Sequence, residues 1–226
     1  MKVRARFRIW RDFPVAKDTG SAVKVYSPYG RGNSDLLAGP RPVSYMRDEA
    51  VHALPDLLAQ LPIEKPILLG HSDGASIALI YPGAQDRVCG LALLASHGFV
   101  EDLSVKNIAR VKKSFESTEL SPETGAPSTR CRVHVLGWND VWLDPDLRRW
   151  NIEEYLPRMM CPILAVQGIG DEYGTMAQVQ ALKRQSSGSV EIVALAECRH
   201  SPQRDPTDAV LAAIAGLGNK SQAGGV

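Results

Sequence analysis

The chain has 226 residues, of which 44% are hydrophobic and 23% charged, as in an ordinary globular protein. This length is enough for one good core, so we predict a single domain over residues 1–226 and exclude a second full domain. The 26 basic and 25 acidic side chains leave a net charge of +1, which argues against nucleic acid or an anionic membrane as a partner. No apolar run approaches the roughly 18 residues of a membrane span, and the basic stretch at 2–11 lacks a signal peptide's apolar segment. We therefore expect a cytoplasmic protein.

Strands and helices alternate along most of the sequence. Apolar runs predict strands at 22–27, 66–70, 90–95, 162–168 and 189–195. Helical patterns lie at 44–61, 74–81, 174–186 and 206–217, and the second of these is expected to stop at Pro82. Such alternation predicts the α/β class: a mostly parallel sheet with helices on both faces.

The first residues depart from this pattern. Residues 2–9 alternate basic and apolar side chains, as a strand with one polar face does. A central parallel strand is buried on both faces, and the arginines at positions 4, 6 and 8 would be costly there. We interpret the segment as an edge strand or a frayed end.

Residues 99–157 interrupt the alternation with helix-like pieces and a Ser/Pro/Gly-rich segment at 117–130. An insertion before a late strand either forms a lid over a site, with Trp138 and Trp142 as apolar walls, or packs as a plain subdomain, and the sequence favours neither. Asp144 is expected to cap a helix that begins after Pro145.

The motif Gly-x-Ser-x-Gly at 70–74 directly follows the predicted strand 66–70. Five letters alone occur by chance, but a strand before them and a helix after them favour a sharp turn that exposes the hydroxyl of Ser72 above a sheet. Ser72 is therefore the candidate nucleophile.

A nucleophilic serine needs a base and a carboxylate that orients the base. Asp171 lies in a glycine-rich loop after the predicted strand 162–168 and is the candidate acid; the neighbouring Glu172 ranks behind it because its side chain would point away. His200 follows the last predicted strand and is the candidate base. In a parallel sheet the carboxyl ends of all strands meet at one edge, so Ser72, Asp171 and His200 are expected to converge.

The other four histidines fit this order less well. His52 and His134 are interpreted as surface or packing residues. His97 follows the strand 90–95, close enough to line the site but too early in the chain for the base. His71 lies inside the motif, where its backbone matters more than its ring. We predict that His71, His97, Trp138 and Trp142 line the substrate site.

Together these pieces resemble the α/β-hydrolase fold family, in its serine hydrolase branch with a shortened N-terminus. The resemblance reaches from about Trp10 to Leu217. It rests on Tyr-Gly-Arg-Gly-Asn-Ser-Asp at 29–35, the motif at 70–74, Asp171 and His200; segments 42–50, 137–142 and 171–175 are similar to a bacterial branch of the family. The resemblance implies a Ser72–Asp171–His200 triad and a small helical lid inserted at 99–157.

The resemblance also implies an oxyanion hole, and here the sequence departs from the family. The N–H of Asp73, after the nucleophile, is one expected donor. Family members usually supply the second donor from a His-Gly loop after a central strand, and no such segment precedes Ser72 here. Losing one donor costs about 10²- to 10³-fold in turnover, so activity is expected to be impaired. No strand is predicted at the place in the chain where the family has this central strand, which leaves the middle of the sheet in question.

The function predicted from the sequence is a cofactor-independent serine hydrolase that cleaves an ester or similar acyl compound through an acyl-enzyme intermediate. Two alternatives stay open: a carbon–carbon bond hydrolase on the same triad, and a catalytically impaired or non-enzymatic member of the fold. The glycines lack dinucleotide-binding spacing and the four cysteines are scattered, so no cofactor and no metal are predicted. The expected partner is a small acyl substrate, without nucleic acid or membrane, and the oligomeric state stays open.

Overall fold

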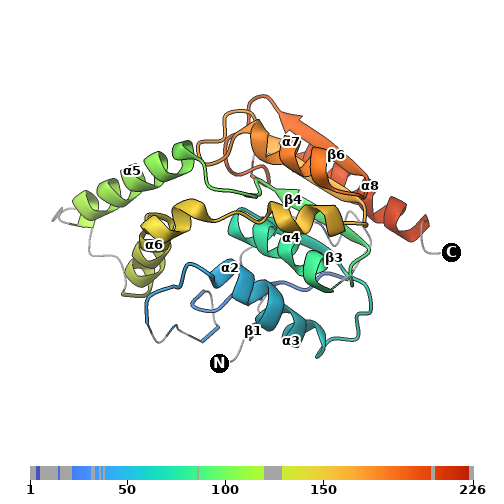
Figure 1. Cartoon of the computed structure of the whole chain (residues 1–226), viewed down its shortest axis with the longest axis horizontal. Coiled ribbons are helices and arrows are strands. Elements are labelled where there is room, and N and C mark those ends of the chain that lie inside the picture. The colour runs from blue at the N-terminus through green and yellow to red at the C-terminus, as the bar shows by residue number, and fades with distance from the viewer. Residues whose placement is uncertain are drawn as a thin grey trace.

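A parallel sheet of four strands forms the centre of the protein (Figure 1). The strands are β3 (Ile67–His71), β4 (Gly90–Leu94), β5 (Ile163–Gly168) and β6 (Val190–Leu195), and they lie side by side in chain order. The computed structural model describes residues 4–5, 15, 22–31, 34–35, 37, 39–85, 87–119, 129–204 and 207–223. The four strands confirm the predictions for 66–70, 90–95, 162–168 and 189–195, each within a residue at either end.

Alternate residues of the two middle strands face opposite layers of helices. Leu91 and Leu93 of β4 belong to one buried cluster, while Ala92 and Leu94 belong to a second. All five residues of β4 and all six of β5 are buried. Because both faces are covered, these strands consist of continuous apolar runs instead of alternating ones.

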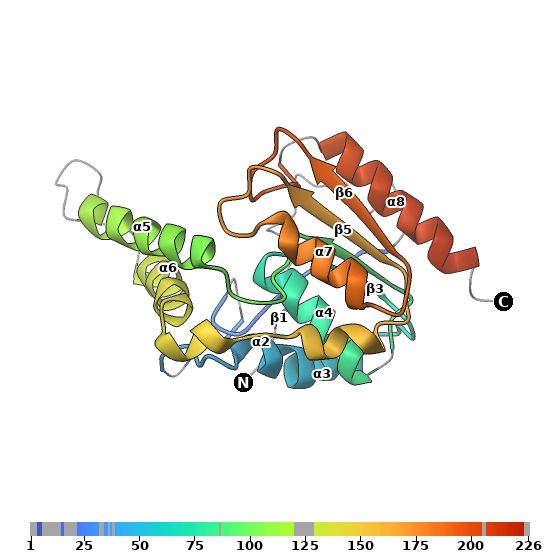
Figure 2. The same cartoon turned by 45° about the horizontal axis from the view of Figure 1, so that its top comes forward.

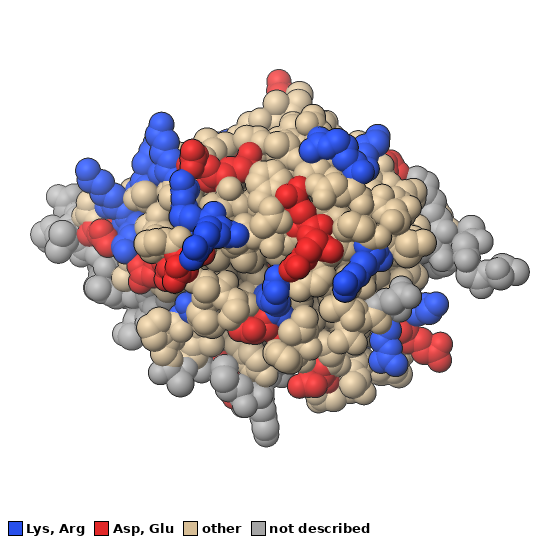
Figure 3. All heavy atoms as spheres, in the orientation of Figure 1, with Lys and Arg blue, Asp and Glu red and all other residues tan. Residues whose placement is uncertain are grey.

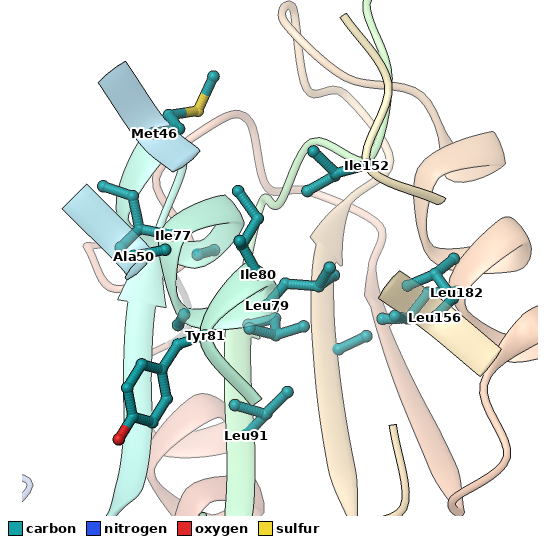
Figure 4. Packing of buried hydrophobic residues seen from close by; sticks show 14 of the residues in the cluster. Met46, Ala50, Ile77, Leu79, Ile80, Tyr81, Leu91, Ile152, Leu156 and Leu182 are labelled. Atoms are coloured by element: carbon teal, nitrogen blue, oxygen red, sulfur yellow. The ribbon is translucent and has the colours of Figure 1, made fainter. Parts of the chain in front are cut away.

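The larger cluster lies between the sheet and the helices α4 (Asp73–Gln85) and α7 (Met176–Gln185). A helical stretch made of α2 (Tyr45–Asp48), the π-helical turn Glu49–Ala53 and α3 (Leu54–Leu58) packs against α4 and confirms the prediction for 44–61. Figure 4 shows Met46 and Ala50 of this stretch beside Ile77 of α4. The smaller cluster lies under α8 (Thr207–Ala223), which covers the other face (Figure 2).

The sequence predicted that helix α4 stops at Pro82. In the structure the helix continues to Gln85, so this prediction is wrong. Proline inside a helix removes one hydrogen bond and is costly, so packing must compensate. Pro82 and Gly83 are both buried. A Cβ on Gly83 would lie 2.7 Å from Cβ of Tyr155 and 2.8 Å from Cε of Met159. This close contact with the neighbouring segment carries the helix beyond its proline.

The predicted strand at 22–27 is shorter in the structure and lies outside the parallel sheet. Only β2 (Tyr26–Ser27) is extended, and it pairs antiparallel with β1 (Arg4–Ala5) in a separate two-stranded ladder. Within the described strands β3 is therefore an edge of the four-stranded sheet. The pairing of β1 agrees with the edge strand expected in 2–9, and the remainder of that segment lies outside the described residues.

Two helices within 99–157 extend away from the sheet in both views (Figures 1 and 2). They are α5 (Asp102–Glu119) and α6 (Thr129–Trp142), joined by the salt bridge of Lys112 and Asp140 at 2.7 Å. Two 3₁₀ helices follow, Pro145–Arg149 and Glu153–Arg158. The Asp144 side chain accepts from the N–H of Asp146 at 2.8 Å, which confirms the predicted cap.

Basic and acidic side chains are interspersed on the face shown in Figure 3, as the near-neutral composition predicts. Among the described residues, no helix is both long and apolar enough to cross a membrane.

Candidate active site

Ser72 lies directly after β3 and before α4, in a left-handed backbone conformation with φ of 54°. Its N–H donates to the carbonyl of Leu94 at 2.9 Å, which ties it to β4. Its own carbonyl accepts from the N–H groups of Ala75 and Ser76 in the first turn of α4. A non-glycine residue with positive φ is strained, and here neighbours on both sides hold it.

The two glycines of the motif differ in what the fold requires of them. A Cβ on Gly70 would lie 2.2 Å from the carbonyl oxygen of Gly74, so no larger residue fits. A Cβ on Gly74 would meet nothing within 4 Å. The close approach of strand and helix therefore explains the first glycine but not the second.

Asp171 and His200 form a hydrogen-bonded pair at the carboxyl ends of β5 and β6. His200 Nδ1 lies 2.9 Å from Oδ1 and 3.0 Å from Oδ2 of Asp171, whose side chain is completely buried. Gln167 Nε2 and the N–H of Tyr173 each donate to the same carboxylate at 2.8 Å. Burial raises the pKa of Asp171, but the hydrogen bond and charge of His200 and these two donors outweigh it, and the pKa is lowered overall.

A glycine allows the two loops that carry this pair to meet. Gly168 ends β5, and a Cβ there would lie 2.3 Å from the carbonyl oxygen of Arg199 and 2.5 Å from that of Cys198. The backbones of the Asp171 loop and the His200 loop therefore touch at this point, which brings the two side chains within hydrogen-bond distance.

Glu172 contacts the backbone of His200 instead of its ring. Its Oε2 accepts from the His200 N–H at 3.3 Å, and its Oε1 pairs with Arg199 at 3.1 Å. The ring itself is bonded to Asp171. The structure thus places Asp171, and not Glu172, where a carboxylate orients the imidazole.

His71 connects the His200 loop to the Ser72 turn. Its Nε2 donates to the carbonyl of His200 at 2.6 Å, and the two rings lie 4.9 Å apart between centroids. Burial, and then the neighbouring His200, lower the pKa of His71 to about 4, so its ring is neutral at pH 7. Among the described residues no hydrogen bond joins Ser72 Oγ to His200; in unliganded enzymes such contacts are often long and tighten when substrate binds.

The side chain of Asp73 receives donors from two distant parts of the chain, neither of them foreseen from the sequence. Trp142 Nε1, at the end of α6, donates to Oδ1 at 3.3 Å and also contacts the Tyr45 hydroxyl at 3.1 Å. Arg31, after β2, pairs with Oδ2 at 3.2 Å. Trp142, predicted as an apolar wall of the site, is 1% exposed and lies beside the Asp73 side chain. The one sequence signal for this network was an acidic residue after the nucleophile.

His97 is buried beside the pair, and its backbone is fixed. Its ring lies 6.0 Å from that of His200 and 5.1 Å from that of Trp142, between centroids. The hydroxyl of Ser76, in α4, accepts from the N–H of His97 at 3.2 Å and donates to its carbonyl at 2.8 Å. Its Nδ1 is buried and has no hydrogen-bond partner among the described residues. Burial, and then His200, lower its pKa to about 4.

Trp138 reaches the pair through another aromatic ring. It is partly buried and packs edge-on against Tyr173 at 6.2 Å, and Tyr173 packs edge-on against His200 at 4.7 Å. His52 is exposed in the π-helical turn, whereas the side chain of His134 lies outside the described residues. Within the described ranges no group of three His, Cys, Asp or Glu side chains is arranged to hold a metal ion.

Comparisons with known proteins bear on the fold and the family of the chain. The model of the alpha/beta hydrolase family matches residues 7–213. No curated protein matches the sequence. Among solved structures, the chain is similar to an esterase from Exiguobacterium antarcticum, with 16% identity, a TM-score of 0.62, and 87% of this chain and 81% of that chain covered.

Two further structures have slightly higher TM-scores. For a proline iminopeptidase from Mycobacterium smegmatis the TM-score is 0.66 with 17% identity, covering 94% of this chain and 85% of that chain. For a meta-cleavage product hydrolase from Pseudomonas fluorescens IP01 the TM-score is 0.66 with 14% identity, covering 94% and 86%. Identities this low establish the fold alone, but the family match extends over most of the sequence. The chain belongs to the alpha/beta hydrolase family.

Proposed function

We propose that the protein is a serine hydrolase that cleaves an ester or similar acyl compound through an acyl-enzyme on Ser72. Membership of the family supports a hydrolytic role in general. The observation that carries the finer proposal is the hydrogen bond between the buried Asp171 and His200, because His71 also ties the His200 loop to the strained Ser72 turn.

In this mechanism Ser72 Oγ attacks the acyl carbon while His200 Nε2 takes the hydroxyl proton. Asp171 holds Nδ1 and stabilises the imidazolium, which is why its buried charge is needed. The imidazolium then protonates the leaving group as the bond to the acyl carbon breaks. A water molecule, activated by the same imidazole, releases the acid and restores Ser72.

The oxyanion is assigned to the start of α4. The N–H of Asp73 belongs to the first residue of this helix of 13 residues, where backbone N–H groups lack helical acceptors and the helix dipole is positive. Both features stabilise a negative charge that develops next to Ser72.

We further propose that the segment 99–157 is a lid within a single domain. The first turns of α5 already contact the acid's loop: Asn107 Nδ2 donates to the carbonyl of Glu172 at 2.6 Å, and the Ser104 hydroxyl donates to that of Tyr173. Trp138 of α6 packs on the same Tyr173. A movement of these helices would therefore shift Tyr173, whose ring packs against His200.

The test is labelling of the purified chain with a fluorophosphonate, read by intact mass, beside Ser72→Ala. The reagent requires an activated serine and no knowledge of the substrate. We expect one adduct on the natural chain and none on the variant, and Ser114→Ala, an exposed serine of α5, serves as the matched control that still labels.

No adduct on a chain that circular dichroism shows to be folded would contradict the proposal and favour a non-enzymatic member of the fold. The chain could also form the adduct and then cleave carbon–carbon bonds but not acyl esters. That result would keep the triad and replace ester cleavage by carbon–carbon bond hydrolysis as the proposed reaction. The meta-cleavage product hydrolase among the similar structures makes that comparison worthwhile.

A further inference from the structure

A salt bridge next to the proposed nucleophile has no role in the mechanism above. Nη2 of Arg31 lies 3.2 Å from Oδ2 of Asp73. The side chain of Arg31 is 26% exposed and that of Asp73 is 11% exposed. The pair therefore lies at the border of the interior, where water and salt screen charges less than they do on an open surface.

The remaining contacts of the Asp73 side chain indicate that it is ionised. Trp142 Nε1 donates to Oδ1, and Arg31 Nη2 donates to Oδ2. Burial, and then the Asp73 charge, raise the pKa of the neighbouring Tyr45 well above its ordinary value, so that hydroxyl keeps its proton. Both hydrogen-bond partners of Asp73 are donors and one is an arginine, which is the environment of an ionised carboxylate.

This negative charge belongs to the residue that also supplies the proposed oxyanion donor. The Asp73 N–H is expected to face the oxygen on which charge develops after Ser72 attacks. Two negative charges so close together repel each other, and more strongly in a partly buried site than in water. The carboxylate therefore opposes the transition state unless a cation balances it.

Arg31 is the described cation that contacts Asp73. The neighbouring Arg41 is engaged elsewhere: it donates to the carbonyl of Tyr29 at 3.1 Å and lies over the Tyr45 ring at 5.0 Å. Glu49, the nearby acid, accepts from the N–H of Tyr29. Arg41 acts on Asp73 through its charge alone, so Arg31 is the described cation in direct contact with the carboxylate beside the nucleophile.

We propose that Arg31 is a positioning residue of this hydrolase, which neutralises Asp73 so that an oxyanion can form at the N–H of the same residue. The inference rests on the proposed function. Arg31 acts through Asp73 and does not itself touch the reacting atoms, so its contribution to rate disappears when the charge on Asp73 is removed.

The test is a double-mutant cycle on the rate of fluorophosphonate labelling. In this reaction the Ser72 Oγ–phosphorus bond forms, the phosphorus–fluorine bond breaks, fluoride leaves and the serine proton passes to His200, with negative charge developing on the phosphoryl oxygen. We expect Arg31→Met to slow labelling about 10- to 100-fold when Asp73 is present. In chains that carry Asp73→Asn, the same change is expected to alter the rate by less than about threefold.

Two further variants separate charge from structure. Arg31→Lys keeps the positive charge and is expected to retain labelling within about tenfold of the natural rate. Arg47→Met removes an exposed arginine of α2 that pairs with Glu154, and it is expected to change nothing. Thermal unfolding of each variant checks that the chain is folded, because a purely structural loss would not be relieved by Asp73→Asn.

Labelling of Arg31→Met at the natural rate would overturn this inference and leave the proposed function intact. The inference is also overturned if Arg31→Met slows labelling by the same factor in chains that carry Asp73→Asn. Absence of labelling in the natural chain overturns the proposed function, and this inference with it.

Discussion

The environment of His97 is not explained by packing alone. Its Nδ1 is buried and has no hydrogen-bond partner within the described part of the chain. The residue is 2% exposed, and Ser76 holds both its N–H and its carbonyl. An unpaired buried polar atom costs about 1–3 kcal/mol. A fixed, neutral imidazole beside His200 is suited to exchange a hydrogen bond with a hydroxyl or carbonyl group of a substrate.

Replacement of His97 by phenylalanine tests this role. The ring is kept but its hydrogen-bonding atoms are lost, so selectivity for a polar acyl group is expected to fall. We expect the ratio of kcat/KM for p-nitrophenyl 3-hydroxybutyrate over p-nitrophenyl butyrate to drop about tenfold. An unchanged ratio would show that the ring only packs.

At the scale of the elements, the site depends on how closely two loops approach each other. Asp171 and His200 are carried by the loops after β5 and β6, and Gly168 is the point where their backbones touch. The hydrogen bond between acid and base therefore depends on a residue that has no chemistry of its own.

Gly168→Ala is expected to separate these loops. The added methyl group would lie 2.3 Å from a carbonyl oxygen, so backbone must shift. We expect fluorophosphonate labelling to fall at least tenfold and unfolding in urea to show a loss of about 1–3 kcal/mol. Gly216→Ala in α8, where a Cβ meets nothing within 4 Å, is the matched control and is expected to be neutral or stabilising. Equal behaviour of the two variants would contradict the argument.

At the scale of the whole molecule, the buried histidines link stability to pH. Burial and the neighbouring His200 lower the pKa of His71 and His97 from 6.5 to about 4. Above pH 6.5 both rings are neutral in the folded and the unfolded chain, so neither changes stability with pH. As the pH falls from 6.5 towards 4, the unfolded chain binds protons that the folded chain does not, and stability is lost.

The expected loss is up to about 3 kcal/mol for each of the two histidines. Urea unfolding between pH 7 and pH 4.5 measures it, and His97→Phe is expected to make the decline shallower because one of the two groups is gone. His52→Gln, which changes an exposed histidine, is expected to leave the slope as it is. A midpoint that stays constant over this range would show that the buried rings take up protons freely. The lowered pKa of Asp171 adds a further loss of stability, which begins as the pH falls below about 5.

The sequence by itself determined the class of fold and the elements that carry the site. Strands β4 and β5 are buried on both faces and therefore have continuous apolar runs, which predict a parallel sheet without reference to any contact. The strand-turn-helix context singled out Ser72, and the ends of the later strands singled out Asp171 and His200. These predictions rest on local patterns, which survive folding unchanged.

The tertiary structure alone decided contacts between residues far apart in the chain. Pro82 indicated the end of a helix, yet burial against Tyr155 carries α4 past it. The pairing of Asp73 with Arg31 joins residues 42 positions apart, and no local pattern encodes it. Propensity and periodicity describe what each segment can form, whereas burial and charge pairing depend on which segments the fold brings together.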